Sequence, residues 1–173
     1  MIWMDIVFVL ARYEKIIMRS TGEMIMNNNQ VEIVIFEEKH FIGVPVTVAF
    51  QKHDPERIKE ANQIFLTRKN EIKGIINEHE YVCPHFANDV LFTYIYCMEV
   101  SEISDIPDGM LGFNVPSQRY AKVSSTDQDP YKLIKSYLKA KGLENNTRSL
   151  ALEVFRFGEH QNINNASIFV PLL

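Results

Sequence analysis

The stretch Asp129-Pro-Tyr-Lys-Leu-Ile-Lys-Ser-Tyr-Leu-Lys-Ala-Lys-Gly142 predicts a helix and marks both of its ends. Aspartate is a favourable N-cap, proline is tolerated at the first helical position, and glycine often follows the last turn of a helix. The apolar residues of the stretch form one side of that helix: Leu133, Ile134, Tyr137 and Leu138. The sequence therefore predicts an amphipathic helix that packs this side on a core.

The same helix start occurs earlier, at Asp54-Pro55, which lies 75 positions before Asp129-Pro130. This first helix is expected to end near Lys73-Gly74. Its apolar stripe consists of Ile58, Ala61, Phe65 and Ile72. Each helix start follows two strand-like runs and precedes at least one more. We interpret this pattern as an internal duplication of a strand-strand-helix-strand unit, with halves of about 31–104 and 105–173.

The runs around both helices are short, rich in β-branched and aromatic residues, and bounded by turn residues, which is typical of strands. The expected strands are Val31–Lys39, Phe41–Phe50, Val90–Val100, Met110–Val115, Arg119–Ser124, Leu150–Phe157 and Ala166–Leu172. The segment Ile75–Asp89 contains Pro84 and is expected to be an irregular connection. If both helices cover one side of the strands, the remaining faces of the two half-sheets can form a shared concave groove.

Glu153 is a carboxylate inside the otherwise apolar strand Leu150–Phe157. Because side chains alternate along a strand, Glu153 shares a face with Phe155 and Phe157. A carboxylate held out of water needs a partner, and leaving it unpaired typically costs several kcal/mol. Candidates for an internal partner are Arg119, Tyr120 and Arg156. The alternative is that Glu153 waits for the cation of a ligand.

One face of the expected strand Val90–Val100 is almost wholly aromatic. The strand Val90–Val100 occupies the same place in the first half as the strand of Glu153 does in the second half. Its aromatic face and the face of Glu153 are therefore expected to lie opposite each other across the groove. The alternative is a buried sheet face, which the tyrosines weaken because each buried hydroxyl needs a polar partner. The proposed ligand-binding residues are Glu153, Tyr120, Phe92, Tyr94, Tyr96, Phe113 and Phe155.

The 173-residue chain has an ordinary globular composition, with 46% hydrophobic and 23% charged residues. Its formal net charge is −4 and its basic residues are scattered among acids, so direct binding of nucleic acid is not expected. The apolar segment Met1–Leu10 contains Asp5 and is too short to span a bilayer, so no membrane association is expected. Residues 1–30 are interpreted as an N-terminal extension or as a misassigned start, with Met24 or Met26 as the native one.

The two cysteines, Cys83 and Cys97, lie too far apart for a Cys-x-x-Cys site. They suit a reducing cytoplasm without structural disulfides, so the expected location is cytoplasmic. Cys83-Pro-His85 is interpreted as a loop thiol and a surface histidine, not as half of a metal site. The five histidines share no spacing, so neither a metal nor another cofactor is expected.

A series of motifs follows along the chain: Ile106-Pro-Asp-Gly-Met110, Val115-Pro116, Tyr120-Ala121, Tyr137-Leu138, Leu152-Glu-Val-Phe155 and Ile168-Phe-Val-Pro-Leu172. In this order and spacing they resemble the GyrI-like effector-binding domain. That domain is the ligand-sensing half of AraC-type and MerR-type multidrug regulators and also occurs alone. A second set of motifs is similar to the integron-cassette effector-binding branch: Tyr81-Val-Cys-Pro-His-Phe-Ala-Asn88, Phe92-Thr-Tyr94 and Glu99-Val100.

The resemblance covers about Val31 to Leu173 and implies an α+β fold of pseudo-twofold duplicated βαββ units. In such a fold the antiparallel sheets carry two helices on one side, and a concave groove between the halves accepts bulky, often cationic and aromatic, molecules. The family's acid in the penultimate strand maps onto Glu153. Regulators of the family carry a helix-turn-helix domain ahead of this one, which residues 1–30 cannot supply. A stand-alone protein is therefore implied, or one that works through a separate DNA-binding regulator.

These observations favour a non-catalytic, ligand-sensing protein that binds hydrophobic, cationic aromatic small molecules with Glu153 as the acidic anchor. One alternative is a hydrolase in which Glu153 and a neighbouring tyrosine provide the general base. The lack of any tryptophan other than Trp3 weakens that alternative. Another alternative is a gyrase-inhibitor-like factor that binds a topoisomerase.

Overall fold

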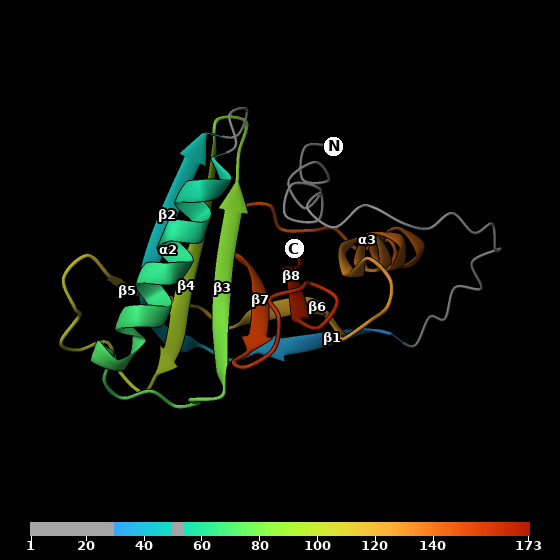
Figure 1. Cartoon of the computed structure of the whole chain (residues 1–173). Coiled ribbons are helices and arrows are strands. Elements are labelled where there is room, and N and C mark those ends of the chain that lie inside the picture. Colours follow the sequence, from blue (N-terminus) through green and yellow to red (C-terminus); the bar gives the residue numbers. More distant parts are fainter. Residues whose placement is uncertain (1–29, 50–53) are drawn as a thin grey trace.

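The computed structural model describes residues 30–49 and 54–173, which form one eight-stranded antiparallel sheet with helices on one of its faces (Figure 1). The strands are β1 (Val31–Phe36), β2 (Lys39–Ala49), β3 (Glu80–Ala87), β4 (Leu91–Val100), β5 (Leu111–Val115), β6 (Gln118–Ser124), β7 (Ala151–Arg156) and β8 (Ser167–Pro171). The helices are α2 (Pro55–Arg68), the short 3-10 turn η2 (Lys69–Glu71) and α3 (Pro130–Lys141). The expectations for the N-terminal extension and its start lie outside the described residues.

Both helices begin where the repeated Asp-Pro pairs predict. The carboxylate of Asp54 accepts a hydrogen bond from the Arg57 amide at 3.2 Å. The carboxylate of Asp129 accepts two, from the Tyr131 amide at 3.1 Å and the Lys132 amide at 3.2 Å. These bonds satisfy N–H groups that have no partner within the first turn of a helix. The two predicted helix starts are therefore confirmed.

The helices differ at their C-terminal ends. Gly142 ends α3 in the left-handed conformation, with φ 63°, as expected for a glycine cap. The α-helical part of α2 ends at Arg68, earlier than the predicted Lys73-Gly74, and continues as the 3-10 turn. Ile72 still reaches the core, but from extended backbone beyond that turn. The apolar stripe was therefore correct in its residues and wrong in treating the last of them as helical.

The strand order β1-β6-β8-β7-β3-β4-β2-β5 confirms the duplication. The units β2-α2-β3-β4 and β6-α3-β7-β8 have the same internal order, because the third strand of each unit lies between its other two. The units join where β3 pairs with β7. The strand that precedes each unit pairs in the other one, since β1 lies against β6 and β5 lies against β2. The halves are thus tied together at three places in one sheet.

The segment Ile75–Asp89 is not irregular, because it contains the central strand β3. Pairing of β3 with β7 is continuous, and Pro84 lies opposite Leu152 there. The register with β4 includes Val82 opposite Cys97 and resumes only at His85 opposite Tyr94. The interruption coincides with proline, which has no N–H to donate to a ladder. Pairing with β4 and β7 therefore stabilises a strand here, although Pro84 is a local signal against one.

The sheet carries a separate apolar cluster on each face. One cluster, the helix-side core, includes Phe65 of α2, Ile134 of α3 and Tyr94 of β4. The cluster on the other face, the helix-free core, includes Phe41 and Tyr120. Because α2 packs on β2 and β4 and α3 packs on β6, β1 and β8, both helices cover the same face. This confirms that the two helices lie on one side of the sheet.

A test of the packing comes from Gly43 on β2, which lies opposite Cys97 of β4. A Cβ atom at Gly43 would overlap the Tyr96 carbonyl oxygen and the Cys97 side chain, and neither belongs to a flexible side-chain end. We expect Gly43→Ala to lower the free energy of unfolding by about 2 kcal/mol, because overpacking forces the strands apart. Urea denaturation measures this loss. Thr47→Ala, at an exposed position of the same strand, serves as the control, and an unchanged midpoint for Gly43→Ala would contradict the predicted close approach.

Candidate ligand-binding site

Glu153 lies in the middle of β7, opposite Cys83 of β3 on one side and Ile168 of β8 on the other. Only 3% of its surface is exposed. This register places its side chain on the same face as Ile168 and Tyr94, which belong to the helix-side core. The expectation that Glu153 faces a groove on the helix-free side is therefore wrong. The strand alternation was correct, but the face that the helices cover could not be derived from it.

Two tyrosine hydroxyls hold the Glu153 carboxylate. Tyr94 on β4 donates a hydrogen bond to Oε2 at 2.6 Å, and Tyr131 in the first turn of α3 donates to Oε1 at 2.7 Å. Short bonds of this kind are typical of an O–H donor and an ionised acceptor. The carboxylate is therefore held between strand β4 of the sheet and helix α3.

None of the three internal partners considered for Glu153 contacts its carboxylate. Arg156 forms an ion pair with Glu80 at 3.6 Å, and Tyr120 donates its hydroxyl to the Leu150 carbonyl oxygen at 3.0 Å. Within residues 30–49 and 54–173, no lysine or arginine forms an ion pair with Glu153. In the same ranges, Arg119 forms no ion pair with any acid. Glu153 is therefore hydrogen-bonded there without an ion pair to a lysine or an arginine.

The two tyrosines remain donors over a wide pH range. Burial, together with the negative charge of Glu153, raises the pKa of the Tyr94 and Tyr131 hydroxyls well above the ordinary value. A phenol that keeps its proton can donate to the carboxylate but cannot act as a base at neutral pH. Of the three side chains Glu153, Tyr94 and Tyr131, only Glu153 therefore carries a negative charge.

His85 is part of the same cluster, although the sequence analysis treated it as a surface residue. It lies on β3 with 5% of its surface exposed, and its ring stacks on that of Tyr94 at 5.7 Å between centroids. Its Nε2 atom is 3.3 Å from the Tyr131 hydroxyl, and its Nδ1 atom is 3.2 Å from the Cys83 carbonyl oxygen. The interpretation of Cys83-Pro-His85 as a loop thiol and surface histidine is wrong, because both side chains are buried in a strand.

The sequence offered a signal for one of the two missed residues. Tyr131 falls three positions before Ile134, which places both on the same side of α3. His85 had no comparable signal, because Pro84 concealed the strand whose alternation puts the imidazole beside Tyr94.

The structure brings five of the seven predicted ligand-binding residues to one face: Glu153, Phe92, Tyr94, Tyr96 and Phe155. The rings of the first three aromatic residues follow one another along β4, with centroid distances of 6.0 Å and then 5.0 Å. Phe155, two residues after Glu153 on β7, stacks on Tyr81 at 5.4 Å between centroids. The predicted aromatic face of β4 therefore lies next to Glu153.

Phe113 and Tyr120 lie elsewhere, in the helix-free core. Phe113 stacks on Phe41 at 5.7 Å between centroids. Tyr120 is fully buried, its ring packs edge-on against Phe36 at 5.4 Å, and burial raises its pKa to about 12. Each lies on a strand position that points away from the helices, so the structure does not bring these two residues to Glu153.

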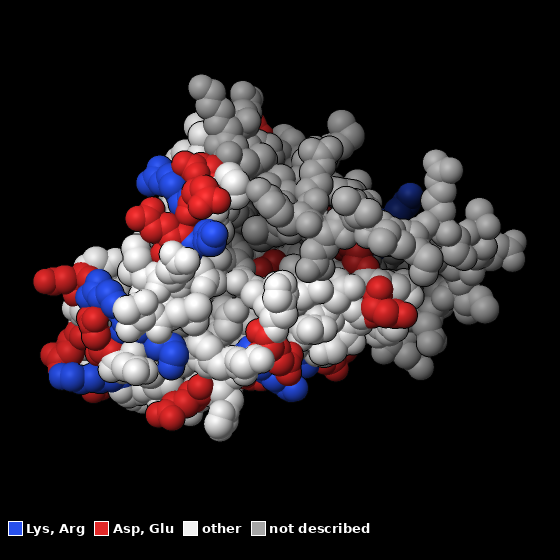
Figure 2. Space-filling model, in the orientation of Figure 1, with Lys and Arg blue, Asp and Glu red and all other residues white. Residues whose placement is uncertain are grey.

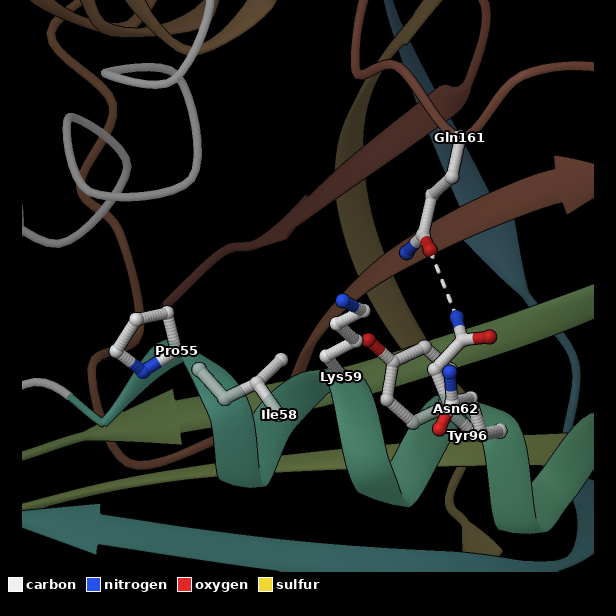
Figure 3. A pocket seen from close by; sticks show the side chains of 7 residues that line it. Pro55, Ile58, Lys59, Asn62, Tyr96 and Gln161 are labelled. Atoms are coloured by element: carbon white, nitrogen blue, oxygen red, sulfur yellow. Dashed lines mark hydrogen bonds between the residues drawn. The ribbon is translucent and has the colours of Figure 1, made fainter.

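A pocket of about 370 Å³ opens beside Tyr96, at the other end of the aromatic row. It is lined by Pro55, Ile58, Lys59, Asn62, Gln63, Tyr96 and Gln161. Figure 3 shows Gln161 reaching from the connection between β7 and β8 toward α2, where its Oε1 atom accepts a hydrogen bond from Asn62 at 2.9 Å. The pocket thus lies between one helix and a loop of the other repeat.

Charged side chains do not form a single-sign surface on the face drawn in Figure 2, where basic and acidic groups intermingle around α2. Among the residues that the structure describes, no cluster of three or more histidine, cysteine or acidic side chains is arranged to hold a metal ion. Within the same ranges, no helix combines the length and the apolar character needed to cross a bilayer.

Solved structures share this fold at low sequence identity. The C-terminal domain of EcmrR has a TM-score of 0.61 and 11% identity, covering 83% of this chain and 97% of that domain. SAV2435 bound to tetraphenylphosphonium has a TM-score of 0.58 and 12% identity, covering 83% and 93%. A hydrolase from Listeria innocua has a TM-score of 0.53 and 10% identity, covering 83% and 92%. At these identities the likeness concerns the fold.

No curated protein matches the chain. A family model does: the one described as integron-associated effector binding protein matches residues 32–172, which is most of the sequence. The match includes both repeats, both helices and every residue of the Glu153 cluster. The chain therefore belongs to the family of integron-associated effector binding proteins.

Proposed function

We propose that the chain is a ligand-sensing protein that binds bulky, lipophilic, cationic aromatic molecules on the helix side of its sheet, with Glu153 as the anchor. One observation carries the proposal. The carboxylate is 97% buried, since only 3% of Glu153 is exposed, and its partners in the described part of the chain are two neutral phenols. Each oxygen accepts one hydrogen bond, and no lysine or arginine among the described residues pairs with the carboxylate, so a ligand cation could do so.

The surroundings of Glu153 favour an aromatic cation over a small hydrated one. Phe92 and Tyr94 on β4 are aromatic, and a desolvated cation that replaced His85 against either ring would gain about 0.5 to 2 kcal/mol of cation-π attraction. A lipophilic cation also loses less hydration free energy on burial than a compact ammonium does. The bound tetraphenylphosphonium of SAV2435 is a cation of this class, which supports the same choice here.

A ligand reaches Glu153 by moving the more mobile of its two donors. Tyr94 is 1% exposed in the centre of the sheet, whereas Tyr131 is half-buried in the first turn of α3. Rotation of Tyr131 would release Oε1 and leave that oxygen free to accept from or pair with a ligand. The tyrosine therefore competes with the ligand for one carboxylate oxygen.

Ligand binding would report to a separate DNA-binding regulator. The support for this coupling is the fold shared with the C-terminal domain of EcmrR, a protein whose structure is also known in complex with DNA. Copurification with and without tetraphenylphosphonium would reveal a partner whose association depends on the ligand.

Glu153→Gln tests the anchor. The amide keeps the shape of the side chain but removes the negative charge, so we expect tetraphenylphosphonium to bind at least tenfold more weakly, a loss of about 1.4 kcal/mol or more. Isothermal titration calorimetry measures the affinity. Glu102→Gln, which removes the same charge from an exposed loop, is the matched control and should bind like the wild type. Equal affinities for Glu153→Gln and the control would refute the role of Glu153.

Tyr131→Phe tests the competing donor. Loss of the hydroxyl leaves Oε1 with one hydrogen bond fewer, so the free energy of unfolding should fall by about 1 to 3 kcal/mol. The affinity for tetraphenylphosphonium should rise several-fold, because the cation no longer displaces a hydrogen bond. Tyr137→Phe, on the same helix and also half-buried, should change neither quantity by a comparable amount. Weaker binding by Tyr131→Phe would show that the hydroxyl holds the ligand instead.

The contact chain from His85 through Tyr131 to Glu153 favours hydrolysis of a reactive electrophile as a second function. In such a reaction Glu153 would be the general base or the nucleophile, and a tyrosine would protonate the leaving group. This function ranks second because both carboxylate oxygens already accept a hydrogen bond. It predicts turnover of an aryl epoxide or an activated aryl ester that disappears in Glu153→Gln. Product formation at the buffer rate by the wild type would exclude it for those substrates.

A further inference from the structure

The pocket beside Tyr96 lies next to the proposed cation site, and two packed aromatic rings separate them. The Tyr94 hydroxyl contacts Glu153, and the Tyr94 ring lies 5.0 Å from that of Tyr96. Glu153 on β7 is separated from β4 by the single strand β3, so the backbone distance between the two sites is about 10 Å at a spacing of about 4.8 Å per strand. A ligand of the size of a dye is therefore long enough to span both sites once the Tyr94 and Tyr96 rings move aside.

The chemistry at the Tyr96 end is opposite to that at the Glu153 end. The lining of the pocket includes one lysine, Lys59, three amide side chains and no acidic residue. Within the described ranges, Lys59 forms no ion pair with an acid. The pocket thus presents a positive charge and N–H donors, which suit an anionic acceptor.

The hydroxyl of Tyr96 does not change this polarity. Burial raises its pKa, an effect that hydrogen bonds with Asn62 and Gln161 partly oppose, so the phenol is neutral at pH 7. Gln161 is exposed on its loop, and its Oε1 atom accepts a hydrogen bond from the Asn62 side-chain amide. An incoming carboxylate would replace this oxygen as the acceptor, with Lys59 beside it.

We infer that the pocket between α2 and the β7–β8 connection is a second subsite, which binds a carboxylate carried by the same ligand whose cationic part lies at Glu153. The inference rests on the proposed function and narrows the ligand class to aromatic zwitterions, with an anionic group about 10 Å or less from the cation. A lipophilic cation without an acceptor fills the first subsite only.

Two forms of one dye test the inference. Rhodamine B carries a xanthylium cation and a free carboxylate at neutral pH, whereas its ethyl ester keeps the cation and masks the carboxylate. Fluorescence anisotropy gives the affinity of each for the full chain. We expect the free acid to bind the wild type several-fold more tightly than the ester, which is the contribution of an ion pair with the exposed Lys59 ammonium.

Variants on α2 assign that preference to the pocket. Lys59→Gln should bind the two dyes equally, with its affinity for the ester unchanged. Arg57→Gln removes the same charge from the same helix, at an exposed residue that points about 200° away around the helix axis, and should keep the preference. Comparing the acid-to-ester ratio between variants cancels any steric effect of the ethyl group.

The outcomes separate the two proposals. Equal affinities of both dyes for the wild type, or a preference that survives in Lys59→Gln, would overturn the second subsite while leaving the cation site at Glu153 intact. If neither dye nor tetraphenylphosphonium binds the wild type, the proposed function fails and the inference fails with it.

Discussion

The hydrogen bonds from Tyr94 and Tyr131 to the Glu153 carboxylate are the constraint on which the centre of this molecule depends. A buried carboxylate that loses its donors leaves an unsatisfied charge, at a cost of several kcal/mol. The donors come from β4 in the first repeat and from α3 in the second, and the acceptor comes from β7. The bond from Tyr94 therefore links the two repeats, and the bond from Tyr131 ties α3 to the sheet within the second repeat.

The sheet supports the same position by a different means. β1 precedes the first unit but pairs with β6 of the second, and β5 precedes the second unit but pairs with β2 of the first. The outer strand of each unit is thus paired with the strand that precedes the other unit. These two pairings support the join between β3 and β7. The acid lies at this join because β7 is the strand of the second unit that pairs with β3. Duplication thus provides two similar units, and their asymmetric side chains provide the site.

The negative charge on the helix side of the sheet remains because the two donors to Glu153 are neutral tyrosines. Tyrosines satisfy Glu153 and keep its charge, whereas an arginine in the same place would have cancelled it. Lys59 and the amides beside Tyr96 give the other end of the aromatic row the opposite character. The related folds have only 10 to 12% identity with this chain, so the fold itself does not specify such chemistry. It has to be argued from the side chains that this chain places on the common frame.

The sequence by itself determined the elements that depend on local signals: the Asp-Pro helix starts, the glycine stop of α3, seven of the eight strands, and the pairing of Glu153 with an aromatic face. Caps, turns and alternation act over a few residues, so they can be recognised without a partner strand. Only the tertiary structure decided that β3 forms around Pro84, that Glu153 faces the helices, and that Tyr131 and His85 join it while Phe113 and Tyr120 do not. Those outcomes depend on strand register and on which face the helices cover. Both are set by contacts between residues tens of positions apart, and no local pattern records them.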